Sequence, residues 1–192
     1  MESMQNKKII FKNLNEVIGF TPKVVAYYDI NKTSKIDLYI GDDRPDFGIS
    51  TYSTIGLSEY SIDVTGKNGK DIRVEFIAIC NSDVVEFPNI LASCAFNIIN
   101  SKYSCKPGTV YSNIISDYYD NVEMEHIYFT SPFLWENLKS LEIDNKTVTW
   151  LMAMPISNSE FEFLLANGSD ALEDLLEKSS VDVFNMNRKS IL

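Results

Sequence analysis

The spacing of apolar residues along the first part of the chain changes from a helical period to a strand period. Apolar residues recur three and four positions apart over residues 5–18, which predicts a helix that a glycine and a proline then end. From residue 23 the period shortens to two. A β-branched and aromatic run predicts a strand over 23–28, alternation predicts one over 36–40, and a further β-like run predicts one over 49–55.

The next segments predict a hairpin and a helix that covers it. Polar and apolar residues alternate over 60–64 and over 72–78, and an Asn-Gly turn at 66–69 separates the two runs. A helix is predicted to begin at Phe87-Pro88 and to end near residue 103, because its apolar residues gather on one face. We therefore expect an antiparallel sheet with this helix packed on it.

The pattern weakens after this helix and then becomes strongly apolar. Residues 104–146 predict a loop-rich segment with one strand-like run at 127–129. The run VTWLMAM at 148–154 is almost wholly apolar, which is typical of a strand buried on both faces. We expect Pro155 to end that strand.

Two short helices are predicted near the C-terminus. Ser157 stands three residues before Glu160, the spacing of a capping box, and the helix that follows closes at Asn167-Gly168. A second helix begins at Ser169. Because the sequence has no long linker, repeat or change in composition, it predicts a single α+β domain over residues 1–192. Its mostly antiparallel mixed sheet is expected to be covered by helices.

The negative net charge of the chain limits which kinds of partner it can bind. The 192 residues are 45% apolar, and 17 Lys plus Arg against 27 Asp plus Glu give a formal charge of −10. This balance argues against binding to nucleic acid or to an anionic membrane, and it favours a basic partner. No apolar run approaches the ~18 residues of a spanning helix, and the first ten residues contain no signal-peptide core. We therefore expect a cytoplasmic protein.

Candidate catalytic residues are few, and we predict no catalytic site and no cofactor. The one histidine, His126, lies in the strand-like run MEHIYF and has no recognisable nucleophile motif beside it. We interpret Cys94 as a core residue and Cys105 as a loop thiol; a Cys–His pair stays open as the alternative. The glycine-containing stretches TGKNGK and ANGSD match no phosphate-binding motif.

The loop GDDRPDFG at residues 41–48 is a candidate binding segment. It carries Asp42, Asp43 and Asp46, with Arg44 among them. Three interpretations remain open: a solvated polar turn, which we favour, a contact with a partner, and a metal site built from hard oxygen ligands. The spacing is not that of an EF-hand, and we predict no metal.

Two longer stretches are acidic and lack basic residues. Residues 117–125 hold four acids, and residues 160–177 hold six. Such stretches usually keep a surface soluble, but together they can form one negative face that steers a basic partner. The preferred partner-binding residues combine acids with aromatics in and after the run SDYYDN: Asp117, Tyr118, Tyr119, Asp120, Glu123 and Glu125.

Several motifs occur in a fixed order along the chain. They are H-I-Y-F-T-S-P-F-L-W at 126–135, W-L-M-A-M-P-I-S at 150–157, E-x-x-F at 160–163, A-L-x-x-L-L-E at 171–177 and D-V-F-x-x-x-R-K-S at 182–190. In these motifs the chain resembles the suppressor of fused domain family, and especially its small bacterial antitoxin and immunity-protein branch. Upstream, R-P at 44–45, Y-S-T-I-G-L-S at 52–58 and the proline-started helix at 88–103 extend the resemblance over nearly the whole chain.

The resemblance implies a noncatalytic domain that acts by binding protein. In the bacterial branch, it implies an immunity protein or antitoxin that neutralises a cognate LXG-type toxin, often a nuclease and expected to be basic. The alternative is a general protein-binding regulatory module of the suppressor of fused type. An enzyme is a third class, which would depend on His126, Cys94 or the aspartate loop. The sequence leaves self-association open.

Overall fold

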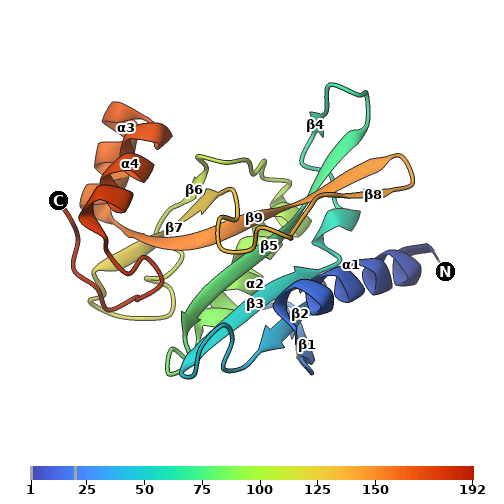
Figure 1. Cartoon of the computed structure of the whole chain (residues 1–192), viewed down its shortest axis with the longest axis horizontal. Coiled ribbons are helices and arrows are strands. Elements are labelled where there is room, and N and C mark those ends of the chain that lie inside the picture. Colours follow the sequence, from blue (N-terminus) through green and yellow to red (C-terminus); the bar gives the residue numbers. More distant parts are fainter. Residues whose placement is uncertain (1, 20) are drawn as a thin grey trace.

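The computed structural model describes residues 2–19 and 21–192, and its elements are arranged around one large sheet (Figure 1). The strands of this part of the chain are β1 (Lys23–Tyr28), β2 (Lys35–Gly41), β3 (Ile49–Ile55), β4 (Val64–Thr65), β5 (Asp71–Asn81), β6 (Val110–Tyr111), β7 (Met124–Thr130), β8 (Leu141–Ile143) and β9 (Lys146–Ser157). The helices are α1 (Glu2–Ile18), α2 (Phe87–Ser101), α3 (Asn158–Asn167) and α4 (Ser169–Ser179), with a 3-10 turn, η1, at Leu57–Glu59.

The sheet is mixed and mostly antiparallel. Its strand order is β1-β2-β3-β5-β9-β7-β6, while β4 pairs with β5 and β8 pairs with β9. Only the β5–β9 pair is parallel among the strand pairs of the described residues. The predicted α+β fold with helices on a mixed sheet is confirmed, and β9 lies between β5 and β7 as expected for its apolar sequence.

Alternation along the strands sends side chains to two faces, and different helices cover them. Leu38 and Phe76 belong to the cluster that packs under α2, whereas their neighbours Tyr39 and Ile77 belong to the cluster under α1. All four are fully buried. Burial of one such side chain contributes about 1.5–3 kcal/mol. The two helices therefore hold opposite faces of the sheet.

A third cluster places the C-terminal helices on the same face as α1, farther along the sheet. Tyr128 of β7 and Met154 of β9 pack beneath Leu164 of α3 and Leu172 and Leu176 of α4. Figure 1 shows α3 and α4 at the end of the sheet away from α1. Within residues 2–19 and 21–192, no helix has the length and apolar character needed to cross a membrane.

Two predicted strand boundaries are wrong. The strand expected over 60–64 is reduced to the two residues of β4, because Ser61 and Asp63 bond to each other and Asp63 adopts a left-handed backbone (φ 55°). Pro155 does not end β9, which continues to Ser157. The β5 ladder stops at Met152, so beyond it β9 has a paired strand on one side only and tolerates proline.

The segment expected to be loop-rich contains more strand than predicted. Residues 104–146 include β6, a seven-residue β7 and the short β8. β6 and β8 have two and three residues. Such short strands leave almost no alternation in the sequence, which is why the pattern did not reveal them.

The C-terminal segment is tied to α3 through a buried ion pair. Ser157 and Glu160 form the predicted capping box, and the Glu160 carboxylate also accepts two bonds from the Arg188 guanidinium, at 2.5 and 2.7 Å. Arg188 donates a further bond to the Pro155 carbonyl at 3.2 Å. Glu160 is fully buried and Arg188 is 6% exposed, so this pair lies in the protein interior.

Candidate protein-binding groove

Helix α2 has an outward face without charge. None of its fifteen residues is Asp, Glu, Lys or Arg. One face is buried in the core, and the opposite face carries the amides and hydroxyl of Asn89, Ser93, Asn97 and Asn100. Surface helices normally place charged residues on the solvent side. Absence of charge on an outward face is instead typical of the central part of a protein interface.

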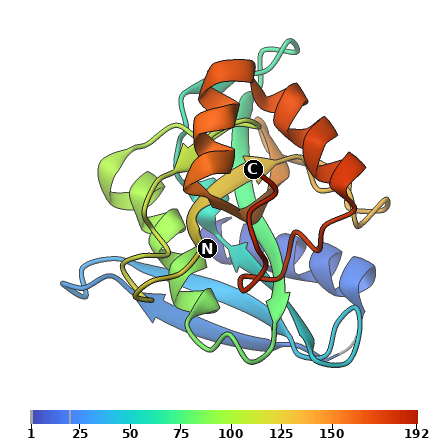
Figure 2. The same ribbon diagram turned by 90° about the vertical axis from the view of Figure 1, so that its left-hand side faces the viewer.

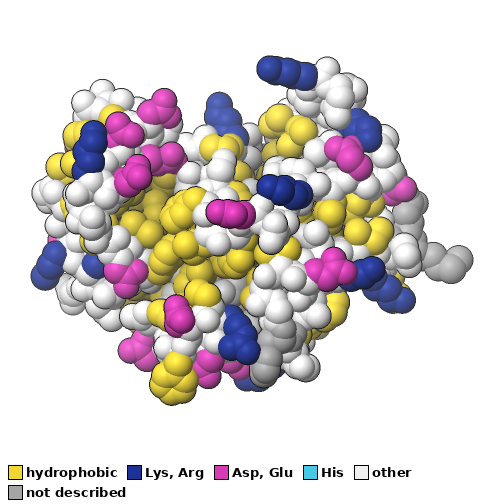
Figure 3. Space-filling model, viewed as in Figure 1, with side chains coloured by type: hydrophobic (Ala, Val, Ile, Leu, Met, Phe, Trp, Pro, Cys, Tyr) yellow, Lys and Arg dark blue, Asp and Glu magenta, His cyan; other side chains and the backbone are white. Residues whose placement is uncertain are grey.

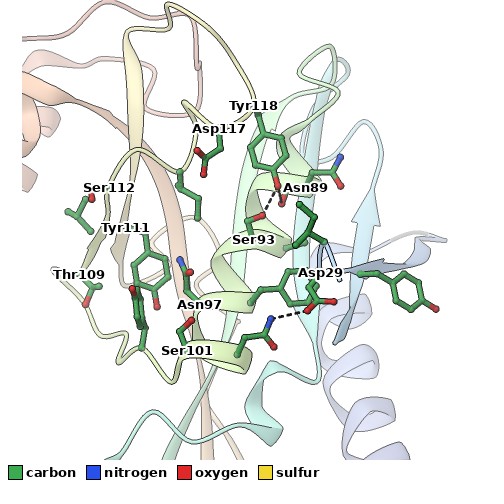
Figure 4. Close-up of a pocket in the computed structure, with 18 of the residues that line it drawn as sticks. Asp29, Asn89, Ser93, Asn97, Ser101, Thr109, Tyr111, Ser112, Asp117 and Tyr118 are labelled. Carbon is green, nitrogen blue, oxygen red and sulfur yellow. Dashed lines mark hydrogen bonds between the residues drawn. The ribbon is translucent and has the colours of Figure 1, made fainter. Parts of the chain in front are cut away.

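This face of α2 forms the floor of an open groove of about 1020 Å³, which we call the α2 groove. One wall is the β1–β2 turn at residues 28–31, and the other is the segment 103–118 that follows α2. Figure 2 shows α2 between the blue β1–β2 hairpin and the yellow-green segment after the helix. Side chains from all three elements surround the groove in Figure 4.

Two tyrosines predicted to contact a partner are held by hydrogen bonds, Tyr118 to α2 and Tyr119 to the N-cap residue of that helix. The Tyr118 hydroxyl lies 2.5 Å from Ser93 Oγ and donates to the Asn89 carbonyl at 3.3 Å. The Tyr119 hydroxyl accepts a bond from the Glu86 backbone N–H at 3.1 Å. Both rings are half-buried against the core. Tyr118 therefore lines the groove in one defined position, and a partner would not have to order it on binding.

Two carboxylates, those of Asp29 and Asp117, line the groove. Asp29 accepts bonds from the Ser34 and Thr33 backbones and from side chains that include Asn100. Hydrogen bonding, chiefly from the Ser34 backbone, lowers the pKa of Asp29, so the group is charged at neutral pH. Asp117 is exposed and has no ion-pair or hydrogen-bond partner within residues 2–19 and 21–192.

The lining as a whole combines tyrosine, asparagine and serine with these two aspartates. Among the described residues that line the groove there is no lysine or arginine. Tyr28 and Tyr103 stand at its edges and are 57% and 53% exposed. Tyr, Ser and Asn supply rigid contact area and adaptable hydrogen bonds in protein-recognition surfaces. The groove is thus suited to a polar protein segment that carries a cationic side chain.

The aspartate loop lies elsewhere, between β2 and β3. Asp42 forms an ion pair with Lys23, and the Asp43 carboxylate accepts from the Gly48 N–H at 2.8 Å. The Asp46 carbonyl accepts from the Ile49 N–H at 3.1 Å, which closes the turn. Across the described residues, no group of three or more His, Cys, Asp or Glu is arranged to hold a metal ion. A partner contact by these three aspartates stays a prediction.

The remaining acids predicted to bind a partner lie in three different environments. Asp120 is exposed. The Glu123 carboxylate lies 3.7 Å from Lys189 Nζ and accepts from the Ser190 N–H at 3.4 Å, while the Glu125 carbonyl accepts from the Ile115 N–H at 3.1 Å. Of the predicted set, Asp117 and Tyr118 line the α2 groove.

The expectation that residues 160–177 contribute six surface acids is wrong at one position. Glu160 is fully buried and paired with Arg188, so it adds no charge to the surface. The other five are exposed. Sequence spacing alone could not reveal this pairing, because Arg188 lies 28 positions farther along the chain.

His126 has a structural environment. It is 2% exposed, its Nδ1 accepts the Asn113 backbone N–H at 2.8 Å, and its Nε2 lies 3.4 Å from Asn158 Oδ1. The acceptor role of Nδ1 assigns the ring proton to Nε2. Phe161 packs edge-on against the ring, with centroids 5.1 Å apart. The ring therefore links the segment after β6 to α3.

The three cysteines are all buried. Burial raises the pKa of Cys80 and of Cys105 to about 12, and it raises that of Cys94 well above its ordinary value. At neutral pH these groups are thiols, and the thiol is a weak nucleophile. Cys94 is a core residue as predicted. Cys105 lies in a loop as predicted, and its thiol is fully buried beside Thr109 and Tyr111.

Sequence comparison identifies relatives over almost the whole chain. Residues 32–189 match the family model of the suppressor of fused protein (SUFU). The chain is 45% identical over 189 residues to the immunity protein YqcF of Bacillus subtilis strain 168. The alignment covers 98% of both chains.

Comparison with solved structures shows the same fold. A SUFU homologue from Neisseria gonorrhoeae FA 1090 superposes with a TM-score of 0.72 at 17% identity and covers 98% of both chains. Drosophila Suppressor of Fused gives a TM-score of 0.68 at 13% identity, with 98% of this chain and 51% of the fly protein covered. At these identities the likeness concerns the fold alone.

Proposed function

The chain belongs to the suppressor of fused family, and we propose that it is an immunity protein that neutralises a cognate toxin by binding it at the α2 groove. The toxin is a basic protein of the LXG type with nuclease activity, and the two meet in the cytoplasm. The 45% identity to an immunity protein over nearly the full length supports the general role. The finer statements rest on charge and on the resemblance in sequence.

One observation carries the choice of surface. The outward face of α2 is uncharged over its full length and lies in a groove whose described lining includes carboxylates but no base. A helix face kept free of Lys and Glu exposes polar amides, which can form hydrogen bonds with a partner and cost less to desolvate than charged groups. The aspartates at the walls then attract a basic segment and repel an acidic one.

Neutralisation in this proposal needs contact and no covalent step. A stable complex of standard size buries about 800 Å² on each partner. A nuclease domain that binds a polyanion presents basic side chains, and an acidic protein can cover them or screen them. Electrostatic attraction speeds the encounter, whereas the half-buried ring of Tyr118, which is hydrogen-bonded to α2, slows dissociation.

The runner-up function is a general protein-binding regulatory module. It is supported by the same groove and by the same family, and it differs only in the partner. Co-purification with the product of the neighbouring gene separates the two. Survival of cells that co-express the two genes, and death of cells that express the neighbour alone, would establish the immunity role; capture of an unrelated protein in its place would favour the regulatory module.

A substitution in the groove tests the proposed surface. Asn97→Arg places a cation on the floor of the groove, where the Asn97 side chain makes no hydrogen bond within the described residues. We expect toxin binding to weaken at least about tenfold, because a like charge then faces the basic partner. Asn137→Arg, at an exposed loop position outside the groove, adds the same charge as a control. Equal binding by both variants would move the interface away from α2.

A further inference from the structure

A second groove lies on the opposite face of the sheet from α2. It has a volume of about 590 Å³ and is bounded by α4, by the end of β7 and by residues 180–183. The helices on this face do not cover it completely: α1 packs at one end and the α3–α4 pair at the other. We call this second opening the α4 groove.

The floor of the α4 groove is apolar. Met154, Leu176, Val181 and Val183 contribute to its lining. Phe133, on the segment after β7, stands at its edge and is 57% exposed, with its ring 6.2 Å from that of Phe184. In Figure 3 hydrophobic side chains fill the hollow between the α3–α4 pair at upper left and the centre of the molecule. An exposed aromatic beside an apolar hollow is typical of an interaction site.

The rim of the groove on the α4 side is acidic. Glu173 and Glu177 line it, and the described lining contains no lysine or arginine. Glu173 Oε1 accepts bonds of 2.6 Å from both the Tyr128 and Thr130 hydroxyls, which hold the carboxylate in place. Acidic side chains gather over α3 and α4 in Figure 3. A partner that enters the groove therefore meets two carboxylates next to an apolar floor.

We propose that the α4 groove binds a second segment of the toxin, one that inserts an apolar side chain and flanks it with lysine or arginine. The proposal rests on the proposed function for the identity of the partner, but not for the chemistry of the groove. An apolar side chain on Met154 and Leu176 excludes water, and the flanking cations reach Glu173 and Glu177. An acidic segment would not match the two carboxylates of the rim, and a wholly polar segment would not match the apolar floor.

The arrangement of Glu173 favours a cation over a neutral donor. Its Oε1 already accepts two hydroxyl bonds, and a carboxylate has further acceptor positions on its second oxygen. A lysine or arginine at that oxygen gains a charge-assisted bond to a group that is already ordered. Lys178, on the same helix, lies 3.6 Å from Asp174 and does not line the groove.

Nuclear magnetic resonance with a defined probe tests the proposal without the toxin. The probe is a short synthetic peptide in which lysine and leucine alternate, titrated into the isotope-labelled full chain at low salt. One matched peptide replaces lysine by glutamate, and another replaces leucine by serine. We expect the lysine–leucine peptide to shift resonances of residues that line the α4 groove, and both matched peptides to bind at least about tenfold more weakly.

A charge reversal localises the effect. Glu177→Lys changes the rim, whereas Glu16→Lys makes the same change at an exposed position on α1, at the other end of this face. We expect the first variant to weaken peptide binding about tenfold or more and the second to leave it within about twofold. Shifts that spread over the surface, equal binding of the glutamate peptide, or equal losses in the two variants would overturn the proposal. None of these outcomes alters toxin binding at the α2 groove, which co-purification tests separately.

Discussion

Replacing Arg188 by Met is expected to destabilise the fold strongly, because it leaves a buried carboxylate without its cation. Arg188 gives Glu160 two bonds, at 2.5 and 2.7 Å, and gives the Pro155 carbonyl a third. Glu160 is fully buried, so water cannot replace the guanidinium. The remaining donors to this carboxylate in the described residues are the backbone N–H groups of Ser157 and Ile191.

The magnitude follows from the burial. Removing one partner of a buried ion pair costs about 3–5 kcal/mol in the free energy of unfolding. In a domain of this size 1 kcal/mol corresponds to a shift in Tm of about 2–4 °C, so Tm should fall by about 6–20 °C. Since a typical domain is stable by about 5–15 kcal/mol, the Arg188→Met variant should remain folded at low temperature but with much of its stability lost.

Urea denaturation followed by tryptophan fluorescence measures this loss in the free energy of unfolding. Two further variants serve as controls. Glu160→Gln combined with Arg188→Met removes both charges and should recover at least about half of the lost stability. Lys189→Met removes the neighbouring cation, whose side chain is 89% exposed, and should change the stability by less than about 0.5 kcal/mol. A loss below about 1 kcal/mol in Arg188→Met, or equal losses in the single and double variants, would refute the reasoning.

Three further predictions concern the core, the pH dependence and the surface. Trp150→Ala should cost about 3–5 kcal/mol in urea denaturation, since Trp150 is 2% exposed in the central strand β9; a loss near zero would contradict this. Burial raises the pKa of Glu75, while hydrogen bonds such as that from Thr54 oppose the shift. The folded chain therefore binds the Glu75 proton more tightly than the unfolded chain does. As the pH rises from about 4.3, the pKa of Glu in an unfolded chain, through the raised pKa, the free energy of unfolding falls by at most about 1.4 kcal/mol per pH unit. Glu75→Gln should remove that slope; parallel pH profiles of the urea midpoint would count against it. Asp117→Lys with Asp120→Lys should slow toxin association at low salt but leave the urea midpoint within about 0.5 kcal/mol, because both side chains are exposed; unchanged stopped-flow rates would place the interface elsewhere.

Local patterns predicted the elements of this fold well, because each depends on residues close in sequence. The β-like runs at 23–28 and 49–55 predicted β1 and β3 with their observed bounds, and Ser157 with Glu160 predicted the start of α3. The prediction at Pro155 was wrong because proline lacks a backbone N–H, and this matters only where a neighbouring strand would accept a hydrogen bond from that position. That neighbour is set by the sheet order, which no local pattern contains.

The candidate site was predicted in part, for a related reason. The run SDYYDN was chosen for its mixture of acids and aromatics, and the structure places Asp117 and Tyr118 in the α2 groove. The floor of the groove was missed, although the absence of charge from Phe87 to Ser101 is visible in the sequence. The α4 groove could not be predicted, because Phe133, Met154 and Leu176 meet only through the tertiary fold.

The central claim is that this chain neutralises a toxin by covering it, without changing it chemically. The most direct test mixes the purified chain with its cognate toxin at a series of molar ratios, separates the two under mildly dissociating conditions, and measures the intact mass and the activity of the recovered toxin. We predict that inhibition requires stoichiometric amounts of the chain, that the toxin mass is unchanged, and that toxin activity returns after separation. Inactivation by substoichiometric amounts, or a recovered toxin of altered mass, would contradict the account.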